Sequence, residues 1–209
     1  MGTAVGWPVA RRRRPTAAAL VAALLLGGAA WLAVDDGSRG RLAALLREAN
    51  PGGGSAAPAG RPEDAVPLRV RSVYDGDTLR LRPAGGTGSG EPGWLADLED
   101  GRVRLIGIDA PEVGEGAECY GAEATAALRA LAPEGSTVWG MADAQEHDRY
   151  GRVLLYLWTD DGRFVQAELA SAGAVETLVV GGNDTYAGLL ASLEGQARDA
   201  GRGQWSACR

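Results

Sequence analysis

The chain has 209 residues, of which 45% are hydrophobic and 23% are charged, a balance that excludes an intrinsically disordered protein. The formal net charge of −6 excludes a surface that attracts polyanions everywhere. Residues 1–66 carry eight arginines and five acidic residues, which leaves 13 basic and 22 acidic residues, a net charge of −9, in residues 67–209. A polyanionic partner of that second part would need a local basic cleft or a bound cation.

Residues 1–34 are predicted to be an export segment. Arg11–Arg14 precede Thr16–Val34, a stretch without a charged residue. As a helix this stretch would be roughly 28 Å long, close to a bilayer core, and the arginines favour an exported remainder. Gly28-Ala29-Ala30 offers small residues for cleavage, so a membrane anchor over residues 16–34 and a cleaved signal peptide are both open. The rest of the chain is expected to be extracellular or at the cell surface.

Residues 35–66 are predicted to be a flexible linker. Leu42, Leu45 and Leu46 have the spacing of one short amphipathic helix, which would stop at Asn50-Pro51. The stretch "PGGGSAAPAGRP" that follows is a low-complexity spacer. The folded domain is therefore expected over residues 67–209.

Short strands begin this domain and helices are interspersed later. Polar and apolar residues alternate on both sides of Asp75-Gly76, which predicts a β-hairpin with a tight turn, because glycine accepts positive φ. Further strands are predicted over 102–108, 138–142 and 153–159, and helices over 121–131, 165–172 and 186–200. This order indicates a mainly β domain of the α+β class, with helices packed on a small closed barrel.

Two acidic segments stand out as candidate metal ligands. In "VYDGDTLRLR" the second aspartate, Asp77, is not needed for a turn. In "RLIGIDAPE" Pro111 favours an extended Ala110, whose carbonyl can then point outward beside Asp109 and Glu112. Calcium prefers this mixture of carboxylate and backbone oxygens. An ordinary hairpin turn and a solvated strand end explain the same two segments without a metal.

One arginine is a candidate for phosphate contacts. Arg152, in "DRYGR", begins a predicted strand, and a guanidinium binds phosphate oxygens in a bidentate way, although a plain turn also explains this segment. Arg104 lies in the strand before Asp109, and strict alternation places the two on opposite faces unless Gly107 marks a bulge.

The two cysteines, Cys119 and Cys208, are predicted to form a disulfide, because an even pair in an exported chain favours one. It would close a loop for which the chain-entropy model gives roughly 4.6 kcal/mol as an upper guide. Two unrelated thiols are the alternative.

Together these motifs resemble the staphylococcal nuclease, or thermonuclease, family. "YDGDT" resembles its first hairpin, "RLIGIDAPE" its arginine strand and calcium loop, and "ECYGAEAT" the start of its first helix. "DRYGR" resembles its second arginine motif, and "GNDTYAGLLASLEGQARDAGRGQW" its last helix and the tryptophan after it. The motifs follow the family order across about residues 68–208. The resemblance implies a five-stranded OB-fold barrel with three packed helices.

The resemblance also implies a site and a reaction. The implied residues are Asp77, Asp109 and the Ala110 carbonyl as Ca²⁺ ligands, Glu112 as general base or as the residue that orients the attacking water, Arg104 and Arg152 as phosphate clamps, and Asp75 and Tyr150 in support. The family hydrolyses phosphodiester bonds of DNA and RNA and leaves 3′-phosphates. One departure is that Leu178 and Val180 stand where the family has two tyrosines near the nucleotide.

The expected function is therefore that of an exported, monomeric, Ca²⁺-dependent nuclease that acts on DNA or RNA. A non-catalytic nucleic-acid-binding barrel is one alternative, because OB-folds often only bind. A membrane-anchored interaction module with a structural calcium site is another. A complete set of five side chains favours the enzyme, since a protein that only binds has little reason to keep them: Asp77, Arg104, Asp109, Glu112 and Arg152.

Overall fold

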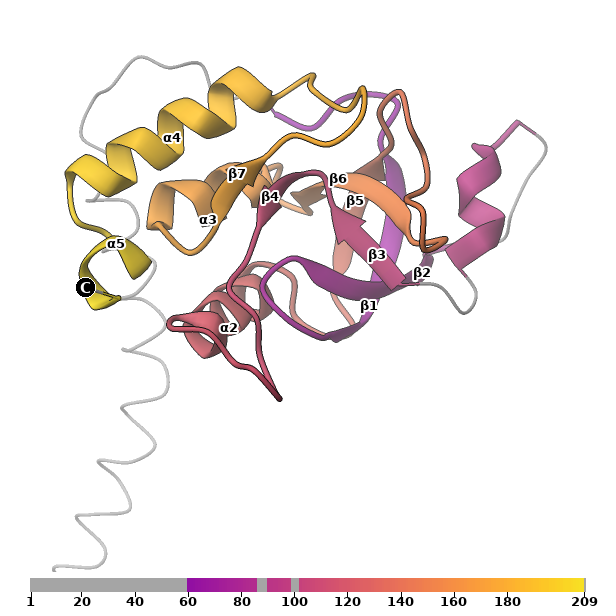
Figure 1. Ribbon diagram of the computed structural model, residues 1–209. Helices are drawn as coiled ribbons and strands as arrows, with labels where there is room; N and C mark the ends of the chain where they lie inside the picture. The colour runs from indigo at the N-terminus through magenta and orange to yellow at the C-terminus, as the bar shows by residue number, and fades with distance from the viewer. Residues whose placement is uncertain (1–59, 86–89, 99–101, 209) are drawn as a thin grey trace, which may run out of the picture. The chain divides into compact units, whose positions relative to one another are not determined.

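The computed structural model describes residues 60–85, 90–98 and 102–208 (Figure 1). The predicted export segment, 1–34, lies outside these residues, as do residues 35–59 of the predicted linker. Within the described ranges, no helix is long and apolar enough to cross a membrane. At the predicted start of the domain, Ala65 is buried and the Arg61 guanidinium lies 3.5 Å from the centroid of the Trp139 ring.

Five strands form a closed barrel (Figure 1). They are β1 (Val66–Val73), β2 (Thr78–Pro83), β3 (Arg102–Leu105), β5 (Thr137–Met141) and β6 (Val153–Thr159). Their order around the barrel is β1-β2-β3-β6-β5, and β1 pairs with β5 to close it. All neighbours are antiparallel except β3 and β6, which are parallel. The predicted five-stranded barrel of an α+β domain is confirmed.

Alternation along the strands explains the barrel interior. On β1 and β2 the side chains of Leu68, Leu79 and Leu81 are fully buried, whereas the arginines between them face outward and are exposed. The burial of β6 is nearly continuous, because α3 (Val165–Ala172) packs against this strand. Trp158 on β6 stacks on Phe164 at 5.0 Å between ring centroids.

Two of the predicted helices match the observed bounds, α2 (Gly121–Leu131) and α3, and the third, α4 (Ala187–Asp199), is one residue shorter at each end. Two short helical segments were not predicted: the 3-10 helix η1 (Gly93–Leu98), which buries Trp94, Leu95 and Leu98, and α5 (Gln204–Ala207). In Figure 1, α3 and α4 lie along one side of the barrel and α2 below it.

The strand predicted over 102–108 is divided in two. β3 ends at Leu105, and β4 (Gly107–Asp109) leaves the barrel to pair with β7 (Glu176–Leu178). Gly107 lies at the break with φ of +82°, and an added Cβ would come within 2.7 Å of Leu190. Glycine is therefore required at this kink for both its conformation and its lack of a side chain.

The predicted tight turn at Asp75-Gly76 differs from the observed one. β1 ends at Val73 and β2 begins at Thr78, and Gly76 is not among the described glycines with positive φ. A Cβ on Gly76 would lie 2.6 Å from the Cβ of Ala110 and 2.9 Å from that of Ala124. Glycine is needed here because the hairpin packs directly against the loop after β4.

The Cys119–Cys208 disulfide is present, with a sequence separation of 89 residues. It joins the residue two positions before α2 to the residue immediately after α5. The bond therefore holds the C-terminal end of the domain beside the segment that follows β4.

We expect Gly76→Ala to reduce the free energy of unfolding by about 1–3 kcal/mol, because the added methyl group overpacks the contact with Ala110 and Ala124. Urea unfolding measures the change. Gly195→Ala in α4 is the control, since a Cβ there meets nothing within 4 Å, and it should stabilise the helix by about 0.5–1 kcal/mol. Unchanged stability of Gly76→Ala would show that the close packing is not required.

Reduction of the disulfide should lower the free energy of unfolding by about 2–5 kcal/mol, because the unfolded chain regains the freedom of a long loop. Thermal melts with and without a reductant test this. A double Cys119→Ser, Cys208→Ser variant should melt at the same temperature as the reduced wild-type protein, and a reductant should not change that temperature. The prediction is wrong if the wild-type protein melts identically in both conditions.

Candidate active site

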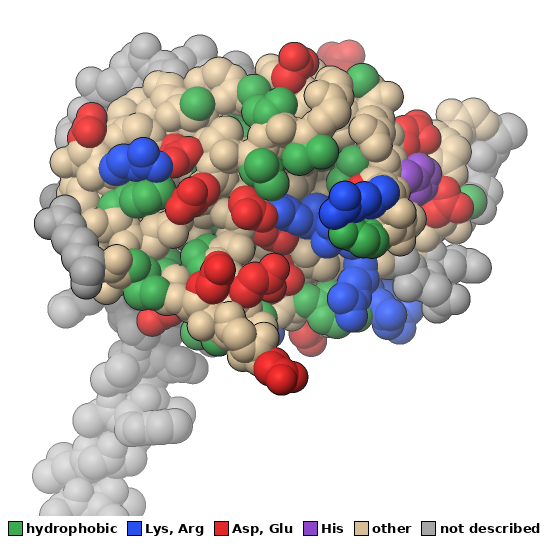
Figure 2. All heavy atoms as spheres, in the orientation of Figure 1, with side chains coloured by type: hydrophobic (Ala, Val, Ile, Leu, Met, Phe, Trp, Pro, Cys, Tyr) green, Lys and Arg blue, Asp and Glu red, His purple; other side chains and the backbone are tan. Residues whose placement is uncertain are grey.

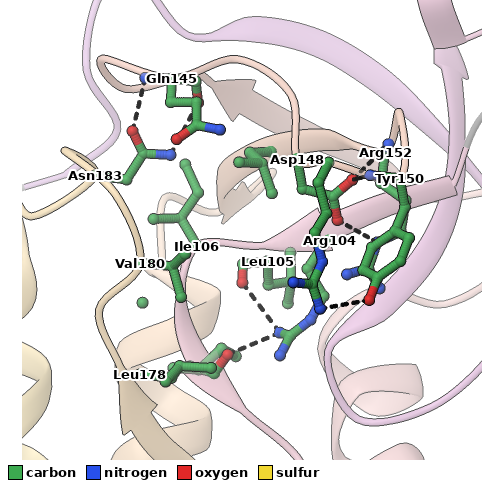
Figure 3. A pocket seen from close by; sticks show the side chains of 14 residues that line it. Arg104, Leu105, Ile106, Gln145, Asp148, Tyr150, Arg152, Leu178, Val180 and Asn183 are labelled. Atoms are coloured by element: carbon green, nitrogen blue, oxygen red, sulfur yellow. Dashed lines mark hydrogen bonds and ion pairs between the residues drawn. The ribbon is translucent and has the colours of Figure 1, made fainter.

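A cleft of about 440 Å³ opens beside β3 and β4 (Figure 3). Arg104, Tyr150 and Arg152 lie on one side of it, and Leu178 and Val180 on the other. The structure therefore brings the two predicted phosphate-binding arginines into one cavity, although they come from separate motifs.

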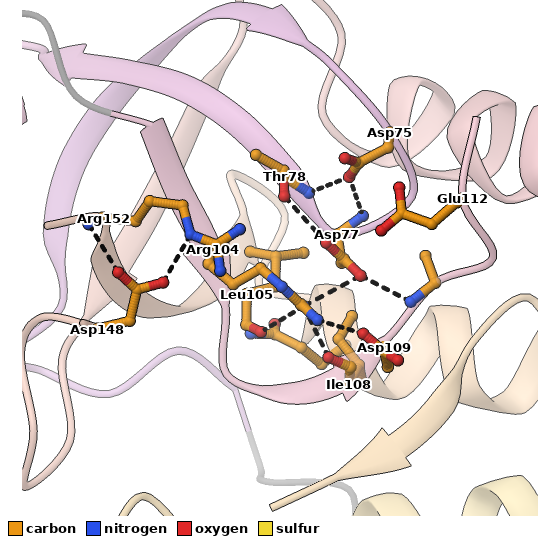
Figure 4. A network of polar contacts seen from close by, with 12 residues as sticks. Asp75, Asp77, Thr78, Arg104, Leu105, Ile108, Asp109, Glu112, Asp148 and Arg152 are labelled. Atoms are coloured by element: carbon orange, nitrogen blue, oxygen red, sulfur yellow. Dashed lines mark hydrogen bonds and ion pairs between the residues drawn. The ribbon is translucent and has the colours of Figure 1, made fainter. Parts of the chain in front are cut away.

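Arg104 connects the two predicted aspartate ligands (Figure 4). Its Nη1 lies 3.0 Å from Oδ2 of Asp77, and its Nη2 donates to Oδ1 of Asp109 at 2.5 Å. Its Nη1 also donates to the Ile108 carbonyl oxygen at 2.7 Å. The kink at Gly107 makes this arrangement possible, because a continuous alternating strand would place Arg104 and Asp109 on opposite faces.

Asp77 is a buried carboxylate with a complete set of partners. Its Oδ1 accepts a hydrogen bond from the Thr78 hydroxyl at 3.0 Å, and its Oδ2 accepts one from the Ala110 backbone N–H at 2.6 Å. Burial raises the pKa of Asp77 to about 7, against the opposing effect of the Arg104 charge. A cation beside Asp77 would favour its charged form.

The chemistry of this donor set fits a hard cation. Asp77 and Asp109 share one guanidinium, and Ala110, the predicted carbonyl ligand, is tied to Asp77 through its N–H. Among residues 60–85, 90–98 and 102–208, no group of three Asp, Glu, His or Cys side chains could hold a metal ion. A cation at the predicted place would thus depend on two carboxylates, backbone oxygen and water, and Arg104 would compete with it for both carboxylates.

Asp75 shapes the hairpin that carries Asp77. Its Oδ1 accepts hydrogen bonds from the backbone N–H of Asp77 at 3.0 Å and of Thr78 at 2.7 Å. Local bonds of this kind stabilise turns. Asp75, the first aspartate of the motif, therefore has a structural role, because its hydrogen bonds fix the start of β2.

Glu112 lies beyond the lining of the 440 Å³ cleft, on an exposed loop. Figure 4 shows its carboxylate turned toward the hairpin that carries Asp75 and Asp77. The Glu112 N–H donates to Oε2 of Glu118 at 3.1 Å, and the Glu118 N–H donates to the Glu112 carbonyl at 2.9 Å. These bonds hold the backbone, while the Glu112 carboxylate has no hydrogen-bond partner or ion pair within the described residues.

Asp148 is a functional candidate that the sequence did not single out. Its Oδ2 accepts from Nε of Arg152 at 2.6 Å, and its Oδ1 accepts from the backbone N–H of Tyr150 at 2.8 Å and of Arg152 at 3.0 Å. Burial alone would raise the pKa of Asp148, but these hydrogen bonds outweigh it and lower the pKa. Because Nε carries the contact, the Nη atoms of Arg152 are left for other acceptors. The signal was an aspartate four residues before an arginine.

The opposite wall of the cleft is positioned by Asn183, which is 2% exposed. Its side chain accepts from the Gln145 N–H at 2.7 Å and donates to the Gln145 carbonyl at 2.8 Å. Leu178 and Val180 are 41% and 64% exposed, so this wall presents aliphatic side chains. The exposed ring at the cleft is that of Tyr150, whose hydroxyl accepts from Arg149 at 2.6 Å.

Comparisons with known proteins agree with this geometry. Residues 102–207 match the family of staphylococcal nuclease homologues. A protein of Escherichia coli named "uncharacterized endonuclease" is 31% identical over 138 residues, which cover 66% of this chain and 76% of that protein. A thermonuclease of Staphylococcus intermedius is 30% identical over 132 residues, which cover 62% of this chain and 70% of that protein. The chain therefore belongs to the staphylococcal nuclease family and is a phosphodiester-hydrolysing nuclease.

Proposed function

We propose that this nuclease is exported, requires Ca²⁺, and cleaves DNA or RNA to leave 3′-phosphates. The observation that carries the proposal is the placement of Arg104, which contacts both Asp77 and Asp109 and lines the same cleft as Arg152. A carboxylate pair for a cation thus adjoins a pair of guanidinium groups for a phosphate. The 3′-phosphate product is proposed from the family resemblance.

The two arginines are assigned to the phosphate group. Guanidinium donors in a partly buried cleft stabilise the charge that develops on phosphate oxygens during hydrolysis. The Arg152 side chain is 31% exposed, and Asp148 fixes its orientation through Nε. Arg104, whose side chain is 13% exposed, is held by the carboxylates and by the Ile108 carbonyl, so a phosphate would reach an arginine that is already oriented.

Glu112 is assigned to the attacking water. Its carboxylate has no competing partner in the described structure, and it is turned toward the hairpin of Asp77 (Figure 4). A carboxylate in this position can accept a proton from water or orient it. Bound Ca²⁺ would supply Lewis-acid stabilisation of phosphate charge, and Asp77, Asp109 and the Ala110 carbonyl are the residues that would hold it.

Export is proposed from the N-terminal sequence and from the disulfide. Arg11–Arg14 and the uncharged stretch Thr16–Val34 have the pattern of an export segment. A disulfide persists in oxidising compartments, which supports a location outside the cytoplasm for the domain. The nuclease is proposed to act there as a monomer, either anchored through residues 16–34 or released by cleavage.

The full chain should hydrolyse single-stranded DNA or RNA in Ca²⁺ and stop when a chelator is added, because the ion supplies part of the charge stabilisation. Release of acid-soluble nucleotides measures the rate, and phosphatase-sensitive 3′ ends identify the product. Restored activity on return of Ca²⁺ controls for damage by the chelator. Undiminished hydrolysis in chelator would contradict the proposed metal requirement, while leaving the nuclease activity in place.

Glu112→Gln should lower kcat by roughly 10²–10⁴ because the amide cannot take a proton from water. Glu115→Gln is a matched control, since this glutamate is exposed on the same loop and should leave kcat within about twofold. Steady-state kinetics decides the comparison, with thermal melts to verify folding. A folded Glu112→Gln variant with wild-type kcat would exclude Glu112 as the base.

A further inference from the structure

Four exposed arginines without an acidic partner among the described residues lie on the outer face of β1, β2 and β3. They are exposed because alternation turns the apolar residues between them into the barrel, and they comprise Arg71, Arg80, Arg82 and Arg102. Within the described ranges, none of them forms an ion pair with an acidic side chain. Figure 2 shows a group of blue arginine side chains on the right-hand part of the visible face and a smaller one on the left, with carboxylates between and beside them. Residues 67–209 therefore have a local basic surface despite their net charge of −9.

The strand register connects this surface to the cleft. β2 and β3 are antiparallel, and Arg80 on β2 lies opposite Arg102 on β3. Two residues away in the same ladder, Thr78 on β2 lies opposite Arg104 on β3. Two residues of a strand span about 6.6 Å, so Arg102 follows Arg104 on the same outer face at that spacing. In the parallel pair of β3 and β6, Val103 lies opposite Val153, which sets Arg152 level with Arg102. The basic surface thus continues the row of arginines that enters the cleft.

An aromatic ring lies within this basic surface. The Cζ atom of Arg102 is 4.3 Å from the centroid of the Tyr74 ring, and that of Arg80 is 5.9 Å from it. A guanidinium stacked on a ring is oriented, yet keeps its N–H donors at its edge free for phosphate oxygens. Arginines combined with an aromatic ring are typical of surfaces that bind single-stranded nucleic acid without sequence preference.

We propose that Tyr74, Arg80 and Arg102 form a strand platform that binds the phosphate backbone of a nucleic-acid strand beyond the cleft. The proposal rests on the proposed nuclease function and specifies the substrate as a strand several nucleotides long. It explains how an acidic domain retains a polyanion, since Leu178 and Val180 offer aliphatic side chains rather than aromatic rings for contact with bases. Contacts to the backbone are independent of base sequence.

Binding is measured by fluorescence anisotropy of a labelled 20-nucleotide single-stranded DNA with the full chain in chelator. The double variant Arg80→Gln, Arg102→Gln should weaken binding roughly tenfold and reduce the slope of log Kd against log salt by about 1.4, for two lost phosphate contacts at about 0.7 each. Tyr74→Leu, verified by its thermal melt, should weaken binding by roughly fivefold or more. The double variant Arg163→Gln, Arg198→Gln removes the same charge elsewhere, from arginines that already have acidic partners, and should change neither quantity. Equal losses in both double variants would overturn the platform.

Cleavage of long and short substrates gives a second test. For the Arg80→Gln, Arg102→Gln variant we expect KM to rise roughly tenfold on the 20-nucleotide strand. On a dinucleotide, which cannot reach the platform, the factor by which KM rises should be at least about three times smaller. An equal rise on both substrates would contradict the proposal. Wild-type protein that cleaves neither substrate would refute the proposed function instead, and the binding experiment in chelator would still decide the platform.

Discussion

The arrangement of the site depends on the ion pairs of the Arg104 guanidinium. The guanidinium joins a carboxylate from the β1–β2 hairpin, Asp77, to a carboxylate from the end of β4, Asp109, and both contacts are 3.0 Å or shorter. Removal of Arg104 would leave both carboxylates without an ion-pair partner, which is costly for the buried Asp77. The geometry of the proposed metal ligands and the orientation of a proposed phosphate-binding arginine are therefore set by the same ion pairs.

Two glycines make that contact possible, each for a different reason. Gly107 kinks the chain with positive φ between β3 and β4, so that Asp109 returns toward Arg104. Gly76 allows the hairpin to pack against Ala110 without an intervening side chain. The loop then donates the Ala110 N–H to Asp77, and the hairpin and the loop become one unit.

The sequence predicted the barrel well because burial and alternation are local signals. The bounds of α2, α3 and β6 follow directly from the apolar pattern and the flanking turns. The break at Gly107 was harder to predict, because a seven-residue alternating strand and two strands with a kink have the same pattern of apolar residues. The reason for the glycine at position 76 was predicted wrongly. Glycine is needed there because of close contact with Ala110 and Ala124, which are distant in sequence, and local turn patterns do not reveal such a contact. Asp148 was not predicted as a site residue, because its role depends on its contact with Nε of Arg152, and the sequence does not show which atoms meet.

We propose that Asp77, Asp109 and the Ala110 carbonyl hold one calcium ion beside the arginine-lined cleft. The most direct measurement is a crystal structure of the full chain grown with Ca²⁺. We expect one ion with all three oxygens at about 2.3–2.6 Å, water at the remaining positions, and Arg104 displaced from at least one carboxylate. An ion bound elsewhere, or Arg104 still bound to both carboxylates with no ion beside them at saturating Ca²⁺, would contradict it.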